Sequence, residues 1–309
     1  MPRPFKQGRF AELPAEPRRP HPYHRVEPRE VVVDSRPFGR IRVHYREHGD
    51  GPPLLLVHGL MTTSYSWRYL LEPLGRRRRV IVPDLPGCGR TDKPDRPYGA
   101  ENLAAFLGEL QEALGVRGCA AVGNSLGGYL CMRLALADPA AFSRLVNIHS
   151  PGWPEPRLHA LNAALSIPGV APLLGWWVRR DPLRWAHANV HYHDETLKSV
   201  EEAREYGEPL AAPEGARAFT RYLAETLAPG AMTAFVRTLE RRRAEGLAFP
   251  VPLCLIYSRT DPMVPPRIGR RLHALIPSAE MHWLDDSSHF AHVDSPDRLI
   301  PLLERFLAR

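Results

Sequence analysis

Cysteine is scarce in this chain of 309 residues, which contains only four. They lie far apart, without the spacing of a metal site or a disulfide framework, and three fall in or beside apolar runs. This pattern favours small, buried thiols in a reducing compartment, and we expect a cytoplasmic protein. The four are Cys88, Cys119, Cys131 and Cys254.

Long apolar runs are absent as well. No uninterrupted stretch reaches the ~20 residues that a membrane-spanning helix needs. Arg3, Lys6 and Arg9 near the N-terminus are followed by no apolar segment, which speaks against a secretory signal. The sequence therefore predicts no membrane span, and its 44% of hydrophobic residues suit a globular core instead.

Negative charge falls short of positive charge, which leaves a formal net charge of +7. Arginine is nonetheless spread along the whole chain, and the one dense run, Arg76 to Arg79, lies between an expected helix and an expected strand. Many nucleic-acid-binding patches have aromatic residues or glycines interleaved with the basic ones, and this run has neither. A solvated loop is the favoured interpretation, and we expect no nucleic-acid partner.

Strands and helices alternate along most of the chain. Residues 1–29 form a proline- and arginine-rich arm that we expect to be loosely ordered. Apolar patterns then predict strands at 31–33, 41–45, 54–57, 80–82, 119–122, 145–148, 253–257 and 280–284, and helices at 66–74, 100–114, 128–136, 267–275 and from 295. Such alternation is typical of an α/β fold whose mostly parallel sheet is covered on both faces.

The alternation stops near Ser150 and resumes near Pro250. Between these points the pattern is helical, irregular and rich in tryptophan, with four of the six tryptophans of the chain. We therefore expect a core of residues 30–149 and 250–309, and a helical cap of residues 150–249 over the strand ends.

Residues 123–127 read Gly-Asn-Ser-Leu-Gly and lie between a predicted strand and a predicted helix. In this Gly-x-Ser-x-Gly pattern a sharp turn exposes the serine as a nucleophile, and the glycines keep Cβ atoms out of the crowded turn. Ser125 would also lie near unpaired N–H groups at the positive end of the helix.

A serine nucleophile needs a base, and the base needs an orienting acid. Reactive residues of such sheets gather at the carboxyl ends of the strands. Asp261 follows the strand predicted at 253–257, and His289 follows the strand predicted at 280–284. The order Ser125, Asp261, His289 matches one of the known triad arrangements, and we expect these three residues to be catalytic.

The negative oxygen that forms during acyl transfer needs two backbone donors. One is expected to be the N–H of Leu126, directly after the nucleophile. The other is expected from the loop after the strand at 54–57, where the N–H of Leu60 is the first choice and that of Met61 the reserve.

Together these features resemble the α/β-hydrolases, from about Glu30 to the C-terminus. The marks of the resemblance are His58-Gly59, the segment Asp84 to Asp92, the elbow Gly123 to Gly127, Asp261 and His289. The resemblance implies an eight-stranded, mostly parallel, doubly wound sheet with a helical cap inserted after the sixth strand. It implies no cofactor.

Other polar residues near these motifs leave alternatives open. Asp285 and Asp286 lie too close before His289 on the same loop to orient its ring well. Some family members take the acid from the loop after the sixth strand, where Glu155 is the first carboxylate. The strand-end position favours Asp261. Three residues are interpreted as structural, fixing loops near the site: His58, Asp84 and Asp92.

The predicted cap holds a histidine cluster, His187, His191 and His193. In a helix, His187 and His191 would share one face at a spacing that zinc sites use. No glutamate accompanies them in the His-Glu-x-x-His manner, and a serine triad needs no metal. A polar or pocket-lining cap surface is therefore favoured over a metal site.

The predicted reaction is two-step acyl transfer through an acyl-enzyme on Ser125. His58-Gly59 together with the segment Tyr65 to Arg68 resembles haloalkane dehalogenases and epoxide hydrolases. Those enzymes use a carboxylate nucleophile. A serine in its place would form with their substrates an ether that water cannot cleave, which argues against both activities. The elbow is also similar to that of hydrolases that cleave carbon–carbon bonds of ring-fission products. Those carry a glycine-rich loop and a tryptophan where this chain has Leu60 to Thr63 and Phe290.

A carboxylic-ester hydrolase is therefore the leading prediction. The alternatives are a carbon–carbon bond hydrolase of ring-fission-type diketones and a non-catalytic ligand-binding member of the fold. The tryptophan-rich cap favours a small ester with an apolar acyl or alcohol part. We expect its pocket to include Met61, Trp153, Trp177, Trp185 and Phe290. The sequence favours no particular oligomeric state.

Overall fold

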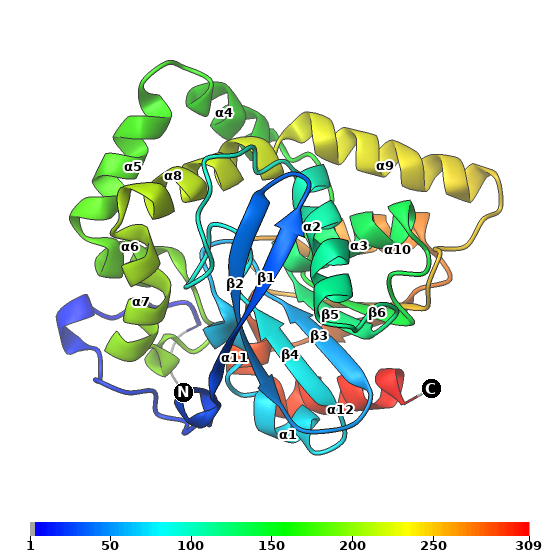
Figure 1. The fold of residues 1–309 in the computed structure, drawn as a ribbon, viewed down its shortest axis with the longest axis horizontal. Coiled ribbons are helices and arrows are strands. Elements are labelled where there is room, and N and C mark those ends of the chain that lie inside the picture. Colours follow the sequence, from blue (N-terminus) through cyan, green and yellow to red (C-terminus); the bar gives the residue numbers. More distant parts are fainter. Residues whose placement is uncertain (1–3, 309) are drawn as a thin grey trace.

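The centre of the protein is one eight-stranded sheet in the order β1-β2-β4-β3-β5-β6-β7-β8 (Figure 1). The structure is a computed structural model that describes residues 4–308. Residues 1–3 of the predicted arm and residue 309 of the predicted core lie outside the described residues. β2 pairs antiparallel with β1 and β4, and the other neighbours pair parallel. The predicted fold class, a mostly parallel eight-stranded sheet, is confirmed. The strands are β1 (Pro28–Ser35), β2 (Gly39–His48), β3 (Pro53–Val57), β4 (Arg79–Pro83), β5 (Ala120–Asn124), β6 (Arg144–Ile148), β7 (Leu253–Ser258) and β8 (Glu280–Leu284).

Alternate residues of the central strands enter two separate cores. On β3, Leu55 and Val57 pack with the face that carries α2 (Ala100–Ala113), α3 (Leu126–Ala137) and α10 (Pro266–Leu275). Leu54 and Leu56 pack with the opposite face, which carries α1 (Leu71–Gly75), α11 (Ala291–Asp294) and α12 (Pro296–Leu307). The continuous apolar run at 54–57 therefore follows from burial on both faces of the sheet.

A helical insertion separates β6 from β7. Figure 1 shows α4 to α8 as a layer beside the sheet, whereas α9 places Met232, Phe235 and Leu239 in the core that contains α2 and α3. The cap is thus inserted after the sixth strand, as predicted. Its helices are α4 (Pro156–Leu165), α5 (Val170–Arg180), α6 (Pro182–Asn189), α7 (Val200–Gly207), α8 (Pro213–Arg221) and α9 (Pro229–Ala244).

No single helix within residues 4–308 is both long and apolar enough to cross a membrane. Taken together, α4 and α5 reach the required length and composition, but a bend of 97° separates them. The two helices therefore form an apolar corner of the cap.

The N-terminal arm differs from the sequence prediction, because its described part is not loosely ordered. The N–H groups of Val200 and Glu201 donate to the carbonyls of Pro14 and Ala15 at 2.9 and 3.0 Å. Tyr23 is fully buried and bonds Ser64 at 2.8 Å. Low apolar content predicted looseness, but prolines stiffen the arm and a few aromatic and histidine side chains attach it to cap and core.

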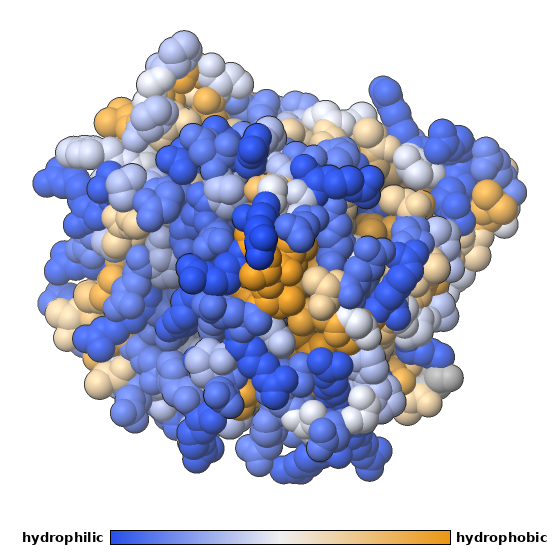
Figure 2. Space-filling model, in the orientation of Figure 1, coloured by the Kyte–Doolittle hydropathy of each residue, from blue (hydrophilic) through white to orange (hydrophobic). Residues whose placement is uncertain are grey.

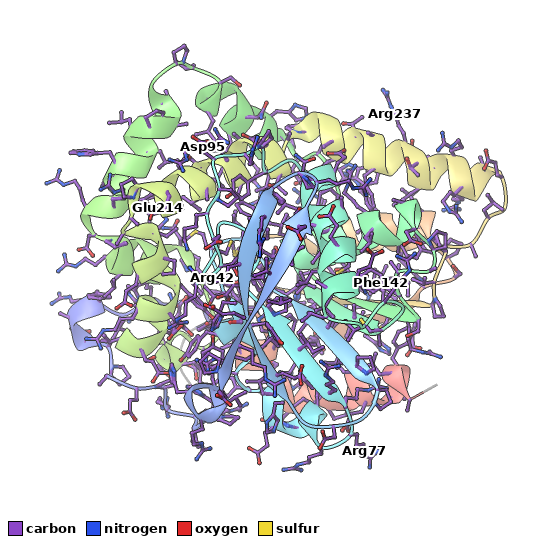
Figure 3. All side chains as sticks on the ribbon, viewed as in Figure 1. Arg42, Arg77, Asp95, Phe142, Glu214 and Arg237 are labelled. Atoms are coloured by element: carbon purple, nitrogen blue, oxygen red, sulfur yellow. The ribbon has the colours of Figure 1, made fainter. Side chains whose placement is uncertain are left out.

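The arginine run at 76–79 lies on the surface. Arg77 is exposed and points away from the ribbon (Figure 3). Arg79 pairs with Glu47 at 2.8 Å, and Arg76 lies 3.8 Å from Glu72. Arg78 donates to the Leu307 carbonyl, so the run is divided among solvent, carboxylates and a backbone acceptor.

Candidate active site

Ser125 occupies a strained turn between β5 and α3. Its φ of 52° lies in the left-handed region that non-glycine residues rarely adopt. A Cβ on Gly123 would come within 2.5 Å of Gly128 Cα, and one on Gly127 within 2.6 Å of the His58 carbonyl. Glycine on both sides is thus a steric requirement of the turn, and the strain is typical of a functional position.

His289 and Asp261 meet in a buried hydrogen bond. His289 Nδ1 lies 2.7 Å from Asp261 Oδ2, and both side chains are almost completely buried. The other oxygen, Asp261 Oδ1, accepts the N–H groups of Met263 and Val264 at 2.7 and 2.9 Å. Burial disfavours the carboxylate, but the charge and hydrogen bond of His289 outweigh it and hold the pKa of Asp261 below its usual value. The geometry therefore keeps an ionised acid against Nδ1 and leaves Nε2 for other partners.

Asn124 connects the loop of His289 to the elbow. Its side-chain Nδ2 donates to the His289 carbonyl at 3.0 Å, and the residue is fully buried. Within residues 4–308 no hydrogen bond joins Ser125 Oγ to the His289 ring, although both residues line the same cavity. The sequence analysis gave Asn124 no role, although its place inside the elbow motif was a clue.

Two backbone donors lie beside Ser125. The N–H groups of Leu126, the first residue of α3, and of Leu60 donate to no other residue in the described range 4–308. Both residues line the cavity with Ser125 and Gly59. Met61, the reserve donor, has a φ of 62° and also lines the cavity. These positions suit stabilisation of an oxyanion.

The alternative acids lie away from His289. Asp285 is exposed and pairs with Arg259 at 3.0 Å, and Asp286 is exposed as well. Glu155 begins the cap at α4 and pairs with Arg267 of α10. Across residues 4–308, Asp261 is the carboxylate that bonds the His289 ring.

The three residues interpreted as structural hold loops. His58 Nε2 accepts the Leu85 N–H at 3.0 Å, and its Nδ1 bonds the Gly59 carbonyl at 2.8 Å. Asp84 accepts the N–H of Ser64 at 2.7 Å and that of Arg90 at 2.9 Å. The third, Asp92, accepts the backbone N–H of Arg42 at 2.7 Å; Figure 3 labels Arg42 on β2.

A cavity of about 700 Å³ lies between the strand ends and the cap. Ser125 and His289 line it from the core, and Leu158, Leu161 and Leu174 line it from the cap. Four of the residues expected in the pocket line this cavity: Met61, Trp153, Trp185 and Phe290.

Trp177 was expected in the pocket and does not belong to it. Its side chain is 64% exposed on α5, and its ring meets that of Trp185 edge-on at 6.2 Å. The prediction followed the abundance of tryptophan in the cap. It failed because an amphipathic helix turns neighbouring side chains in different directions, and Trp177 lies on the outer face of α5.

His149, the first residue after β6, is a site residue that the sequence analysis missed. It is fully buried with a φ of 55°, and its ring centroid lies 5.6 Å from that of His289. Its Nε2 accepts the Ser258 N–H at 2.6 Å, and Nδ1 has no hydrogen-bond partner within residues 4–308. Burial lowers the pKa of His149 to about 4, so the ring is neutral at neutral pH. Its position directly after a parallel strand could have identified it.

Ligand atoms of His149, Asp261 and His289 lie within 4.8 Å of one another, so this group could hold a metal ion. Asp261 and His289 already bond each other, which leaves His149 Nδ1 as the unsatisfied atom of the group.

The cap histidines have separate surroundings. His187 bonds the Gly8 carbonyl at 3.1 Å, and His191 lies 3.4 Å from Glu195 and lines the cavity. His193 lies 3.8 Å from Asp286. The three side chains thus contact the arm, the cavity and the loop before His289 respectively.

The chain matches the model of the alpha/beta hydrolase fold family over residues 52–296. It therefore belongs to the alpha/beta hydrolase fold family.

Curated relatives and solved structures agree with this assignment. The chain is 28% identical to 2-hydroxymuconate semialdehyde hydrolase of Pseudomonas putida, covering 86% of this chain and 91% of the relative. It is 27% identical to the uncharacterized hydrolase YugF of Bacillus subtilis, covering 90% and 97%. A thermophilic esterase from Thermogutta terrifontis superposes with a TM-score of 0.72 at 22% identity, covering 91% of this chain and 98% of that one, and shows the shared fold.

Proposed function

We propose that this protein is a serine hydrolase of carboxylic esters that works through an acyl-enzyme. His289 Nε2 removes the Ser125 proton as Oγ attacks the ester carbonyl carbon, and the carbonyl oxygen becomes an oxyanion. When the tetrahedral intermediate collapses, protonated His289 gives its proton to the departing alkoxide, which leaves as the alcohol. Water, deprotonated by His289, then attacks the acyl carbon, and Ser125 regains the proton as the acid departs.

The oxyanion would be bound by the N–H groups of Leu60 and Leu126. Asp261 would hold the imidazole with its Nδ1 protonated and stabilise the imidazolium that forms in each step. Hydrogen bonds between a nucleophile and its base are often long without substrate and commonly tighten when substrate binds.

One observation carries this proposal most directly. The 2.7 Å bond between His289 and Asp261 lies at the wall of the same cavity that Ser125 lines from its strained turn. Ser125 and His289 thus line one cavity from two strand ends, and Asp261, from a third, bonds His289 Nδ1, an arrangement that suits acyl transfer.

The lining of the cavity favours an apolar substrate. Leucine, tryptophan, phenylalanine and proline side chains predominate around Ser125. Among the described lining residues, Arg157 is the one permanent cation, and it is exposed, while Glu155 is paired with Arg267. We infer that an apolar acyl or alcohol part fills the cavity.

A second candidate, the hydrolysis of carbon–carbon bonds in ring-fission-type diketones, is favoured by the likeness to the Pseudomonas putida hydrolase. Phe290, which meets the His289 ring edge-on at 5.2 Å, and the exposed position of Arg157 speak for the ester instead. An anionic ring-fission product would be expected to need a buried cation.

Labelling with a fluorophosphonate and hydrolysis of p-nitrophenyl butyrate test the proposal. We expect one label per wild-type chain and none on Ser125→Ala, whereas Ser278→Ala, an exposed serine on another loop, labels fully. Hydrolysis should fall with labelling. A well-folded wild-type protein that neither labels nor hydrolyses esters would favour the non-catalytic alternative, and turnover of a ring-fission diketone at a higher kcat/KM would favour the second candidate.

The scattered cysteines support a reducing, cytoplasmic setting as part of the same proposal. Cys119, Cys131 and Cys254 are buried, as expected for small core residues.

A further inference from the structure

Exposed apolar side chains gather on one face of the cap. Within residues 4–308, six large hydrophobic side chains are markedly exposed, and four of them lie in one short stretch: Ile167 (57%), Leu173 (63%), Trp176 (54%) and Trp177 (64%). Leu173, Trp176 and Trp177 share one side of α5 by helical spacing, and Ile167 lies in the turn before it. We call these four residues the α5 face. Figure 2 shows apolar atoms at the upper-left edge, where Figure 1 places α4 and α5.

Basic side chains outnumber acidic ones in the stretch that carries the α5 face, and α8, which packs against α5, adds one exposed carboxylate, Glu214. Residues 156–190 contain four arginines and one carboxylate, Asp181. Asp181 pairs with Arg184, while the other three arginines, Arg157, Arg179 and Arg180, are exposed and have no ion pair within residues 4–308. The Arg180 guanidinium lies 5.0 Å from the centre of the Trp176 ring. Tryptophan and arginine side by side are typical of helices that lie at a membrane interface.

The same helices form the wall of the cavity. Leu158 and Leu161 of α4 and Leu174 of α5 line the cavity, whereas the α5 face points outward. A surface that binds the α5 face would therefore lie against the outside of the wall that encloses Ser125.

We propose that the α5 face is a peripheral docking surface for a membrane that contains anionic phospholipid. Tryptophan rings and leucine would enter the boundary between headgroups and acyl chains, and the unpaired arginines would contact lipid phosphates. A second copy of this chain fits less well, because a two-fold contact would bring together two surfaces on which arginines outnumber carboxylates. If the function proposed above holds, such docking would bring apolar esters from the bilayer to the cavity.

Sedimentation of the full chain with phospholipid vesicles tests this proposal. Wild type is expected to bind vesicles of equal parts phosphatidylglycerol and phosphatidylcholine, and to bind pure phosphatidylcholine much more weakly. Leu173→Gln combined with Trp176→Gln should weaken binding about tenfold, because two apolar anchors are lost while Trp177 still supports Trp185. Arg179→Gln and Arg180→Gln should each weaken it about fivefold at low salt.

Controls separate docking from misfolding and from catalysis. Leu247→Gln removes another exposed apolar side chain, far from α5 in the sequence, and should bind like wild type. Ser125→Ala should also bind like wild type, so a failure of the proposed chemistry and a failure of docking are seen separately. Loss of binding in a variant counts only if its circular dichroism and melting temperature match wild type.

Three results would overturn the proposal. The first is a wild-type protein that stays in the supernatant with anionic vesicles. The second is equal binding to both kinds of vesicle. The third is a wild-type dimer in gel filtration that the Leu173→Gln, Trp176→Gln variant converts to a monomer, which would assign the α5 face to contact between two copies.

Discussion

At the scale of single residues, the two carboxylate oxygens of Asp261 have different partners. Oδ1 fixes the loop after β7 through two backbone N–H groups, and Oδ2 faces His289 Nδ1. Asp261→Asn keeps the size but can present an N–H₂ to Nδ1, which would favour the wrong imidazole tautomer. We expect kcat for p-nitrophenyl butyrate to fall by roughly 10³–10⁴.

Asp285→Asn is the matched control, because Asp285 is an exposed carboxylate four residues before His289 in the sequence and pairs with Arg259 instead. It should retain kcat within about twofold, since surface substitutions away from the reacting atoms change little. Equal losses in the two variants, measured under the same conditions, would show that Asp261 is not the acid.

The residues of the site divide by whether a local pattern marks them. Three positions could be predicted because each comes after a strand, and a short apolar run in the sequence identifies each of those strands: Ser125, Asp261 and His289. The positions of Asn124 and His149 gave a clue to both residues, but not to their contacts, since the hydrogen bond to the His289 carbonyl and the ring contact at 5.6 Å depend on how distant loops meet. Trp177 was placed wrongly, because composition does not tell which face of a cap helix is buried.

At the scale of elements, the elbow depends on the close approach of α3 to the end of β3. Gly127→Ala would place a Cβ within 2.6 Å of the His58 carbonyl, a backbone atom that cannot give way without moving the loop of Leu60. We expect a lower melting temperature and loss of most fluorophosphonate labelling.

Gly108→Ala on α2 is the matched control, since its Cβ would meet Leu134 at an ordinary 3.5 Å. Alanine in a helix interior should raise the unfolding free energy by about 0.5–1 kcal/mol. A Gly127→Ala protein that labels and melts like Gly108→Ala would contradict the steric account of the elbow.

The cap is joined to the core by a buried ion pair between Arg68 and Glu202 of α7. Arg68 Nη2 donates to Glu202 Oε2 at 2.6 Å, and the guanidinium lies 4.4 Å from the Tyr65 ring centre. Glu202→Gln would leave the buried guanidinium without its counter-charge, and we expect urea unfolding at neutral pH to show a loss of about 3–5 kcal/mol. Glu208→Gln, at an exposed position just after α7, should change the free energy by less than about 0.5 kcal/mol. Similar losses for both would contradict this role of the ion pair.

Most elements could be predicted from the sequence, because strands buried on both faces give short apolar runs and helices give periodic ones. The segment at 66–74 was predicted as one helix and is instead a 3-10 turn, Ser64–Trp67, followed by α1. Asp84 accepts the Ser64 N–H at 2.7 Å, and this long-range bond starts the turn earlier than the local pattern indicates. The ordered arm escaped prediction for the same reason, since its partners lie far along the chain, on the cap and, for Tyr23, at Ser64 of the core.

At the scale of the whole molecule, buried histidines make stability fall as the pH falls. The pKa of His149 is about 4 in the folded chain, against an ordinary value of 6.5. Between these values the unfolded chain binds a proton that the folded chain does not, so acid favours unfolding. His149 alone should lower the unfolding free energy by about 3 kcal/mol between pH 6.5 and pH 4.

His149→Asn isolates this contribution, because asparagine tolerates a positive φ and does not titrate. Urea unfolding across the same pH range should give a shallower loss for the variant than for wild type. Asp84 and Asp261, whose pKa values are held below the usual carboxyl value, lose their contributions only at lower pH. The same slope in both proteins would show that His149 does not titrate as its burial requires.

The measurement that tests the central claim most directly is detection of the acyl-enzyme. We predict that mixing wild type with p-nitrophenyl acetate releases an initial burst of one p-nitrophenol per chain, and that peptide mass spectrometry finds the acetyl group on Ser125. The Ser125→Ala protein should give neither. A folded wild-type protein without a burst, or with the acetyl group on another residue, would contradict the account.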